Sequence, residues 1–282
     1  MNSAAPCLGQ DEYALLNEFL AERFGLTFPE HKREILESRV RPRLTYLGLK
    51  SFMDYYLLLQ YNPNGGSELA QLARMVTNNE SYFFRETHQF EALFQHGIED
   101  LKADSALPDS LRFLCAGCSS GEEPYTLNIF AKENQYRMWG RSLTIDAFDL
   151  DDSRIALAKR AEYGPGSLRA ATEEQLARYF LPGHDTETRT LKPAFRLGVA
   201  FRVGNILRPE TFIQPVAYDA IFCRNVLIYF TEVTLRRAVD SFAASLRLGG
   251  LLFLGHSESI IGMSSRFEPL RLGNCIVYRR VP

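Results

Sequence analysis

The stretch FLCAGCSSGEEPYT, residues Phe113 to Thr126, decides the fold. An apolar run is followed by a turn rich in Gly and Ser, and then by residues that favour a helix from about Glu122. A buried strand that breaks into such a turn and helix is typical of α/β sheets that bind a nucleotide-like ligand at the carboxyl ends of their strands. The acids Glu122 and Glu123 are unusual there, because a phosphate needs amide groups without opposing charge.

The rest of the chain from Leu111 alternates between strands and helices. Strands are predicted at 111–117, 143–151, 218–227, 251–258 and 274–281, and helices at 122–138, 152–163 and 231–250. Strands that are apolar on both faces and alternate with helices indicate a mostly parallel, doubly wound sheet. The predicted fold class is therefore α/β, with a Rossmann-like sheet.

Before this α/β region the apolar residues recur at helical spacing as far as Val76. Breaks are predicted at 25–29, at Gly48 and at 62–66, where Gly, Pro and Asn gather. We therefore expect residues 1–85 to form a helical N-terminal domain and residues 86–282 to form the α/β domain.

Between Tyr163 and Asn205 the alternation of strands and helices is interrupted. A polar helix at 171–180 leads to a turn and then to two β-like pieces, 190–197 and 199–207. This pattern predicts a small antiparallel β-subdomain inserted at about residues 165–204, after which the chain returns to the main sheet.

The composition excludes several classes of protein. A formal net charge of −2 over 282 residues does not favour nucleic acid or an anionic membrane as a partner. No apolar run approaches the roughly 20 residues of a membrane span, and the N-terminus lacks the basic and apolar regions of a secretion signal. We expect a cytoplasmic protein without membrane insertion, and a monomer, because nothing indicates an obligate dimer.

The five cysteines are scattered and do not form a disulfide framework. Cys115 and Cys118 have C-x-x-C spacing, but no second cysteine pair or histidine pair completes a zinc site. We interpret both as small residues packed where a strand ends, and we expect no bound metal.

The turn after the first predicted strand also distinguishes between a dinucleotide and other nucleotide-like ligands. A dinucleotide site has the pattern G-x-G-x-x-G, whereas this turn has only Gly117 and Gly121. The acids that follow suit a ligand with an amino group, a sulfonium and a ribose, which is the composition of S-adenosylmethionine. Asp149, at the tip of the next strand, can accept hydrogen bonds from both ribose hydroxyls. Stabilisation of the helix dipole is the alternative role for Glu122 and Glu123.

Five motifs form a more specific pattern. They are NNESYFFRE (78–86), GCSSGEEPYT (117–126), FDLD (148–151), CRNVLIYF (223–230) and LLFLGHSES (251–259). Their order, over nearly the whole chain, resembles the CheR family of chemoreceptor glutamate methyltransferases. The resemblance implies a class I S-adenosylmethionine methyltransferase sheet. It also implies methyl transfer to glutamates on the cytoplasmic methylation helices of chemoreceptors, which gives glutamate methyl esters and S-adenosylhomocysteine.

Matching motif positions imply which residues contact the cofactor. They are Asn79, Ser81, Arg85, Glu123, Asp149, Asn205, Ile206, Arg224 and Asn225. Ser81 stands where the family usually has Thr, and it keeps the hydroxyl. A carboxylate is already a competent nucleophile at neutral pH, so the enzyme mainly has to align the reacting atoms. Arg85 is expected to orient the acceptor carboxylate through a charge-assisted contact, and Tyr229 to donate a hydrogen bond to it.

Structural interpretations of the same residues stay open. Arg85 could pair with Glu86 or Asp149 at the domain junction. Tyr229 could be a core aromatic residue, and Asn225 could cap a turn. His256, in GHSES, is a candidate general base, but we favour structural hydrogen bonds at the end of a strand.

Receptor recognition is expected from the basic segment 31–44. Arg39 and Arg43 fall on one helical face if Pro42 does not break the helix. Receptor methylation helices are acidic in this family's partners, so a basic helix near the active site would steer them. A solvated surface helix is the alternative interpretation.

Some members of the family also dock a receptor tail peptide on the β-subdomain as an added strand. Here the corresponding stretch is shorter, has only Gly183, and contains Pro193, which would interrupt a strand edge. We therefore expect a member that works independently of the receptor tail.

Three other functions remain as alternatives. The chain could methylate another substrate, such as a small molecule or RNA, although the balanced charge disfavours RNA. It could be a non-catalytic cofactor-binding module, although the presence of both Arg85 and Tyr229 disfavours this. An NAD-linked oxidoreductase would also have an acid like Asp149, but its pyrophosphate does not fit the acidic turn.

Overall fold

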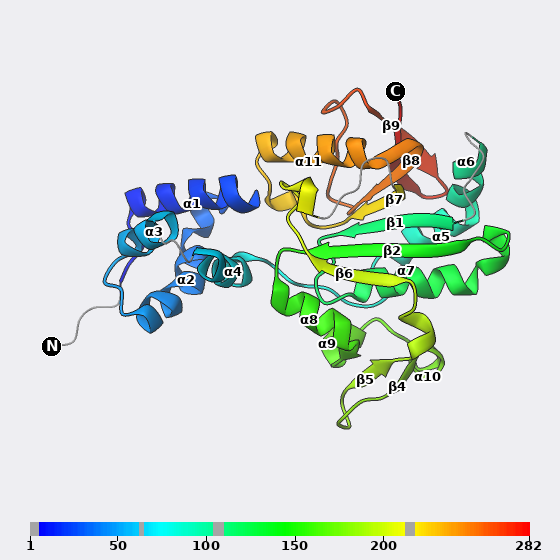
Figure 1. Cartoon of the computed structure of the whole chain (residues 1–282), viewed down its shortest axis with the longest axis horizontal. Coiled ribbons are helices and arrows are strands. Elements are labelled where there is room, and N and C mark those ends of the chain that lie inside the picture. Colours follow the sequence, from blue (N-terminus) through cyan, green and yellow to red (C-terminus); the bar gives the residue numbers. More distant parts are fainter. Residues whose placement is uncertain (1–5, 62–64, 104–109, 212–217) are drawn as a thin grey trace.

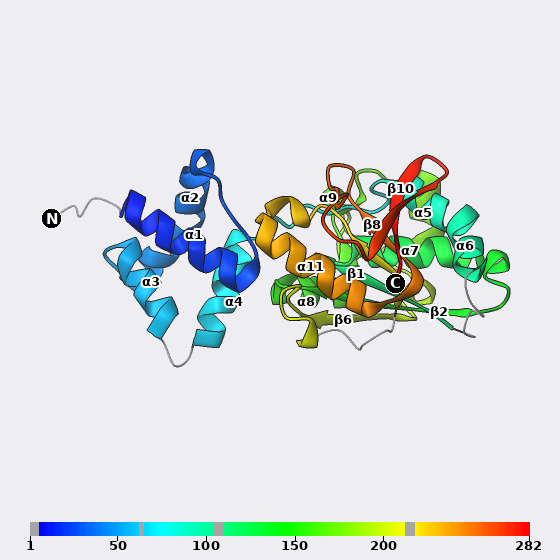
Figure 2. The ribbon, with the colours of Figure 1, turned by 90° about the horizontal axis from the view of Figure 1, so that it is seen from above.

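The structure is a computed structural model that describes residues 6–61, 65–103, 110–211 and 218–282. A helical part and a larger α/β part lie side by side along the long axis of the molecule (Figure 1 and Figure 2). The helical part contains α1 (Gln10–Phe24), α2 (Arg33–Leu47), α3 (Phe52–Tyr61) and α4 (Gly65–Val76). The break predicted at 62–66 lies mostly outside the described residues.

The apolar side chains that predicted these helices form a separate core. It includes Leu16, Phe19, Leu20, Leu36, Val40, Leu44, Phe52 and Tyr55. Helix α2 continues through Pro42, so Arg39 and Arg43 lie one turn apart on the same helix.

The main sheet has seven strands in the order β6-β2-β1-β7-β8-β10-β9. They are β1 (Ser110–Ala116), β2 (Ser142–Asp149), β6 (Val199–Val203), β7 (Tyr218–Cys223), β8 (Leu246–Leu254), β9 (Phe267–Leu272) and β10 (Cys275–Arg280). Strands β6, β2, β1, β7 and β8 are parallel to one another, and β10 pairs antiparallel with β8 and β9. This confirms the predicted mostly parallel sheet.

Helices cover both faces of the sheet, which explains the continuous apolar strands. On β1, Phe113 and Cys115 belong to one core, which they share with α5 (Thr87–Ala92), α7 (Glu122–Glu133) and α8 (Asp152–Arg160). Leu114 and Ala116 belong to the opposite core, under α11 (Glu232–Ser245).

Two segments differ from the prediction. The piece 199–207 was assigned to the inserted subdomain, but its strand β6 pairs parallel with β2 at the edge of the main sheet. Helix α11 ends at Ser245, five residues earlier than predicted, because Leu246 already pairs with Tyr218 across a bulge in β8.

Other elements were not predicted. Strand β9 forms a hairpin with β10, and its face pattern is too irregular to show a period of two. Between the helical part and β1, the chain forms α5, η2 (Leu93–Gly97) and α6 (Ile98–Ala103).

The inserted subdomain contains an antiparallel sheet, which confirms that part of the prediction. The order of its strands is β3-β5-β4. Its strands are β3 (Glu162–Tyr163), β5 (Arg189–Leu191) and β4 (Phe180–Pro182), with α9 (Pro165–Leu168) and α10 (Glu173–Tyr179) between β3 and β4. Phe83 anchors it edge-to-face against Tyr163 and Phe180, with ring centroids 4.7 and 5.0 Å apart. Pro193 does not interrupt a strand, because it begins the short helix η4 (Pro193–Phe195) after β5.

Polar contacts of Thr27, Asn205 and Arg74 are among those that join the helical part to the carboxyl ends of the main strands. The backbone N–H of Thr27 donates to the carbonyl oxygen of Tyr229 over 2.9 Å. The side-chain amide of Asn205 donates to the carbonyl oxygen of Arg23 over 2.7 Å. Arg74 on α4 forms a bidentate pair with Asp152 on α8, both distances being 2.7 Å.

A buried ion pair stabilises the helical part. Glu68 accepts hydrogen bonds from Arg43 Nε over 2.9 Å and from the Tyr55 hydroxyl over 2.8 Å. We predict that Glu68→Ala lowers the free energy of unfolding by about 3 kcal/mol, because both donors lose their acceptor. Chemical denaturation measures this loss.

Glu232→Ala is the matched control, since it removes an exposed pair with Arg236 on α11. It should change the free energy of unfolding by about 0.5 kcal/mol or less. Equal losses in the two variants would contradict a special role for the buried pair.

Candidate functional site

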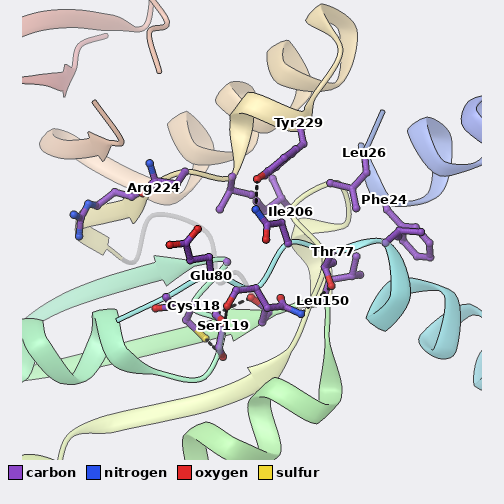
Figure 3. A pocket seen from close by; sticks show the side chains of 18 of the residues that line it. Phe24, Leu26, Thr77, Glu80, Cys118, Ser119, Leu150, Ile206, Arg224 and Tyr229 are labelled. Carbon is purple, nitrogen blue, oxygen red and sulfur yellow. Dashed lines mark hydrogen bonds between the residues drawn. The ribbon is translucent and has the colours of Figure 1, made fainter. Parts of the chain in front are cut away.

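A cavity of about 330 Å³ opens where the helical part meets the carboxyl ends of β1, β2 and β7 (Figure 3). This volume is in the usual range of small-molecule sites. The turns after these three strands line one side of it, and the helical part contributes Phe24, Leu26 and Phe28. Both parts of the chain therefore bound the cavity.

The structure brings all the predicted cofactor and catalytic residues to this cavity. The residues that line it include Asn79, Ser81, Arg85, Glu123, Asp149, Asn205, Ile206, Arg224, Asn225 and Tyr229. They come from five separate segments of the chain, so their convergence is a property of the fold. Their individual roles stay predictions.

Asp149, the last residue of β2, has a fixed orientation. One carboxylate oxygen accepts from the backbone N–H of Ser119 over 2.7 Å, and the other accepts from that of Asp151 over 2.9 Å. Burial raises the pKa of Asp149 to about 6. A carboxylate has about four lone-pair positions, so both oxygens keep the capacity to accept hydrogen bonds from a ligand.

Arg224, just after β7, forms the most buried ionic contact of the site. Its guanidinium lies 3.0 Å from Glu123 and 3.3 Å from Glu86, and its side chain is 2% exposed. It also donates to the carbonyl oxygen of Arg85 over 2.7 Å and lies over the Phe90 ring. The guanidinium thus joins α7, the segment before α5, and the turn after β7.

The two acids of the first turn have different surroundings. Burial raises the pKa of Glu123 although Arg224 opposes it, and Glu123 lines the cavity. Glu122 is 1% exposed and accepts hydrogen bonds from the hydroxyls of Ser120 and Ser167 instead. Only Glu123 and Asp149 therefore present acidic side chains from the tips of β1 and β2.

Arg85 and Tyr229 are 144 residues apart in sequence, yet both line the cavity. The Tyr229 hydroxyl accepts a hydrogen bond from the side-chain amide of Asn78 over 2.7 Å, as the dashed line in Figure 3 shows. Arg85 donates to the carbonyl oxygen of Glu80 over 3.1 Å rather than pairing with Glu86. The alternative that Arg85 pairs with a junction acid is therefore not what the structure shows.

Glu86 contacts the side chains of Arg224 and His256. Burial acts to raise its pKa, but Arg224 and His256 outweigh burial and lower it. His256 Nδ1 lies 2.9 Å from the Glu86 carboxylate, and the histidine side chain is mostly exposed to solvent. His256 is not one of the residues that line the cavity. This agrees with the structural interpretation of His256.

The amide side chains at the cavity hold neighbouring elements in place. Asn79 donates to Asp151, the residue that caps α8, over 2.9 Å. Asn205 accepts from the N–H of Leu207 over 2.9 Å while it donates to Arg23. Asn225 adopts a left-handed backbone conformation with φ of 60°.

The two predicted receptor-binding arginines have intramolecular partners. Arg39 lines the cavity and donates to the carbonyl oxygens of Val76 and Thr77 over 2.8 and 3.3 Å. Arg43 is outside the residues that line the cavity and pairs with the buried Glu68.

Sequence reasoning missed the contribution of the helical part to the cavity wall. Phe24, Leu26 and Phe28 follow one another around the left-handed Gly25 that ends α1. Leu26 forms an isolated antiparallel bridge with Phe230, next to Tyr229. The only signal in the sequence was the break predicted at 25–29, which did not indicate its partner.

In the described ranges, no group of three His, Cys, Asp or Glu side chains is arranged to hold a metal ion. The helices in the same ranges are too short or too polar to cross a membrane.

Comparisons with protein families match both parts of the chain. Residues 79–275 match the family model described as CheR methyltransferase, SAM binding domain. Residues 11–77 match the model described as CheR methyltransferase, all-alpha domain. Together the two models cover most of the chain, and the description of the first gives S-adenosylmethionine as the cofactor of that domain.

Curated relatives agree with the family models over nearly their whole length. Chemotaxis protein methyltransferase 2 of Vibrio cholerae is 31% identical over 260 residues, 92% of this chain and 89% of the relative. Chemotaxis protein methyltransferase 1 of Pseudomonas aeruginosa is 32% identical over 273 residues, 95% and 97% of the two chains. The chemotaxis protein methyltransferase of Escherichia coli is 31% identical over 262 residues, 92% and 88%.

Gly117 tests the packing between the turns after β1 and β7. Its φ is +81°, and an added Cβ would lie 2.5 Å from Val226 Cγ2. We predict that Gly117→Ala weakens S-adenosylmethionine binding about tenfold, because overpacking of about 1–3 kcal/mol pushes the two turns apart. Isothermal titration calorimetry measures the change in Kd.

Gly48→Ala is the matched control, because Gly48 also has a positive φ, +67°, but open space around its Cβ position. It has the left-handed backbone cost of about 1 kcal/mol without a clash. The same Kd for both variants would show that the contact with Val226 does not shape the cavity.

Proposed function

This chain belongs to the CheR methyltransferase family, and we propose that it methylates specific glutamate side chains of methyl-accepting chemoreceptors. The products are glutamate 5-O-methyl esters and S-adenosylhomocysteine, and the reaction serves adaptation in bacterial chemotaxis. We propose that the protein acts in the cytoplasm as a monomer. The observation that carries the proposal is that Arg85 and Tyr229 line the same cavity as the acidic residues that suit the cofactor.

The acidic side chains fit the cofactor's chemistry. Asp149 keeps acceptor capacity for ribose hydroxyls, and its two backbone hydrogen bonds hold it in place. Glu123 lines the cavity together with its partner Arg224, so the acid can accept from a ligand ammonium group and keeps an ionic partner when the ligand leaves. The other proposed cofactor contacts are Asn79, Ser81, Arg85, Asn205, Ile206, Arg224 and Asn225.

S-adenosylmethionine would supply a methyl group on its sulfonium: the acceptor carboxylate bonds to the methyl carbon in line with the breaking C–S bond, and S-adenosylhomocysteine is the leaving group. The protein needs no strong general base, because the acceptor glutamate is already ionised at neutral pH. Its contribution is to orient the carboxylate and exclude water. The Tyr229 hydroxyl accepts its hydrogen bond from Asn78, so its own O–H is free to donate to the acceptor. Arg85 supplies a positive charge on the same cavity wall.

Receptor recognition is proposed for the cavity side of the helical part. Lys32 and Arg39 both line the cavity there and present positive charge to an acidic receptor helix. We do not propose Arg43 as a receptor contact, because it lies outside the cavity and its guanidinium pairs with the buried Glu68.

We also propose that the enzyme works without a receptor tail. Both edges of the small sheet are short: β3 has two residues, and β4 has three and ends at Pro182. The connecting turn is tight, with the N–H of Gly183 donating to the carbonyl oxygen of Thr188 over 2.9 Å. An added peptide strand would find few backbone groups to pair with.

The decisive experiment measures transfer of labelled methyl groups from S-adenosylmethionine to purified receptor cytoplasmic fragments, with and without their last five residues. We expect base-labile methylation of glutamates at equal rates for both fragments. Tyr229→Phe should lower kcat about tenfold or more, because one aligned donor is lost, and it should leave the Kd for the cofactor nearly unchanged.

Two outcomes would contradict the proposal. Cofactor binding without methylation of any receptor fragment would favour another substrate or a non-catalytic module. Methylation only of the fragment that keeps its tail would overturn tail independence while leaving the activity in place.

The raised pKa of Asp149 predicts how cofactor affinity depends on pH. Lowering the pH through about 6 protonates Asp149, and a protonated acid is a poorer acceptor for ribose hydroxyls. We predict that the Kd for S-adenosylmethionine rises about tenfold between pH 7 and pH 5. Asp149→Asn should bind more weakly and lose most of this dependence. A constant Kd for the unmodified protein over this range would exclude Asp149 as the titrating contact.

A further inference from the structure

Glu258, in the GHSES motif after β8, gathers an unusual number of backbone donors. One carboxylate oxygen accepts from the N–H groups of Gly255 and Asn225 over 2.7 and 2.8 Å. The other accepts from those of Val226, Leu227 and Ile228 over 2.9, 2.7 and 3.2 Å. Four of these five donors belong to one short turn, and hydrogen bonds to a charged acceptor are stronger than neutral ones.

That turn, residues 224–229, carries three residues of the proposed site. Arg224, Asn225 and Tyr229 all line the cavity, and Asn225 has a left-handed backbone. The last three residues form the short helix η6 (Leu227–Tyr229), whose first N–H groups have no partner within the helix. Glu258 supplies the acceptor that this turn lacks.

Gly255 shows how closely the two turns fit. An added Cβ there would lie 2.7 and 2.8 Å from the side-chain and backbone nitrogens of Asn225, and 2.9 Å from Glu258. The N–H of Glu258 also donates to the carbonyl oxygen of Gly255 over 2.9 Å. The tight turn from Gly255 to Glu258 therefore brings the Glu258 carboxylate next to the backbone of the turn after β7.

We propose that Glu258 is a positioning residue for methyl transfer, which holds the 224–229 turn so that Tyr229 faces the acceptor. The inference rests on the proposed function, because it assigns Tyr229 to the acceptor carboxylate. Glu258 itself does not line the cavity and touches the chemistry only through the turn. An error of about 1 Å in the position of an orienting group can lower a rate about a hundredfold.

Glu258→Gln is the sharpest variant. It keeps the shape of the side chain, but one oxygen becomes an amide NH₂ that would face other N–H donors. Ser257→Ala, at an exposed position on the same loop, is the matched control. Hydrogen exchange followed by mass spectrometry, calorimetry with S-adenosylmethionine, and initial rates with receptor fragments are measured on all three proteins.

We expect the amides of residues 225–228 to exchange at least about tenfold faster in E258Q. Its kcat, normalised to the cofactor-binding fraction from calorimetry, should fall about tenfold or more, while the Kd for the cofactor and the KM for the receptor change less than about threefold. A purely structural residue would change the folded fraction but not the normalised kcat. A normalised kcat within about twofold of the unmodified protein would overturn the proposal.

A double-mutant cycle provides the second criterion. If Glu258 acts through Tyr229, the loss of kcat caused by E258Q should shrink in the Tyr229→Phe background, and full additivity would count against the proposal. Should E258Q fail to fold, Glu258→Asp, which keeps the charge, replaces it under the same kcat criterion. An unmodified protein that methylates no receptor fragment overturns the proposed function and this inference together; a normal rate that E258Q leaves unchanged overturns only the inference.

Discussion

The guanidinium of Arg224 is the contact on which the geometry of the site depends. It is buried between Glu123 and Glu86 and over the Phe90 ring, so three segments distant in sequence share one charge. A buried cation must keep its partners, because an unpaired charge in this environment costs several kcal/mol. The requirement fixes the start of α7, the approach to α5 and the turn after β7 relative to one another, and these segments present Glu123, Arg85 and Tyr229 respectively.

An anion, Glu258, holds the same turn from its other side. Arg224 draws the turn toward α7, and the carboxylate of Glu258 draws its backbone toward the loop after β8. The two interactions use opposite charges and different atoms, side chain in one case and main chain in the other. A turn whose second residue is left-handed is thereby held by a side-chain ion pair and by main-chain hydrogen bonds together.

Much of the α/β part could be predicted because its signals are local. Residues 113–126 contain an apolar run, a Gly/Ser turn and the start of a helix. In the structure the run belongs to β1 and the helix is α7. Strand β6 was misassigned because its short pattern, with one buried position, does not tell which sheet it joins. The end of α11 was missed because helix and strand are continuous there, and only the pairing of Leu246 with Tyr218 separates them.

The site was predictable to the extent that motifs carry it. The ten predicted cofactor and catalytic residues share one cavity, whereas the wall formed by Phe24, Leu26 and Phe28 has no local signature. For Arg43 the sequence was misleading. It shows a basic residue on a helix, but it does not show that Arg43 pairs with Glu68, 25 positions later. Such pairings depend on how α2 and α4 pack, which no short pattern encodes.

The shared wall has a consequence for the stability of the cavity. The two parts of the chain meet through the polar contacts of Thr27, Asn205 and Arg74. Leu150, Tyr229 and Phe230 of the α/β part also pack against the core of the helical part. Separation of the two parts would expose this apolar surface, which costs free energy in proportion to its area. Integrity of the cavity and stability of the helical part are thereby linked.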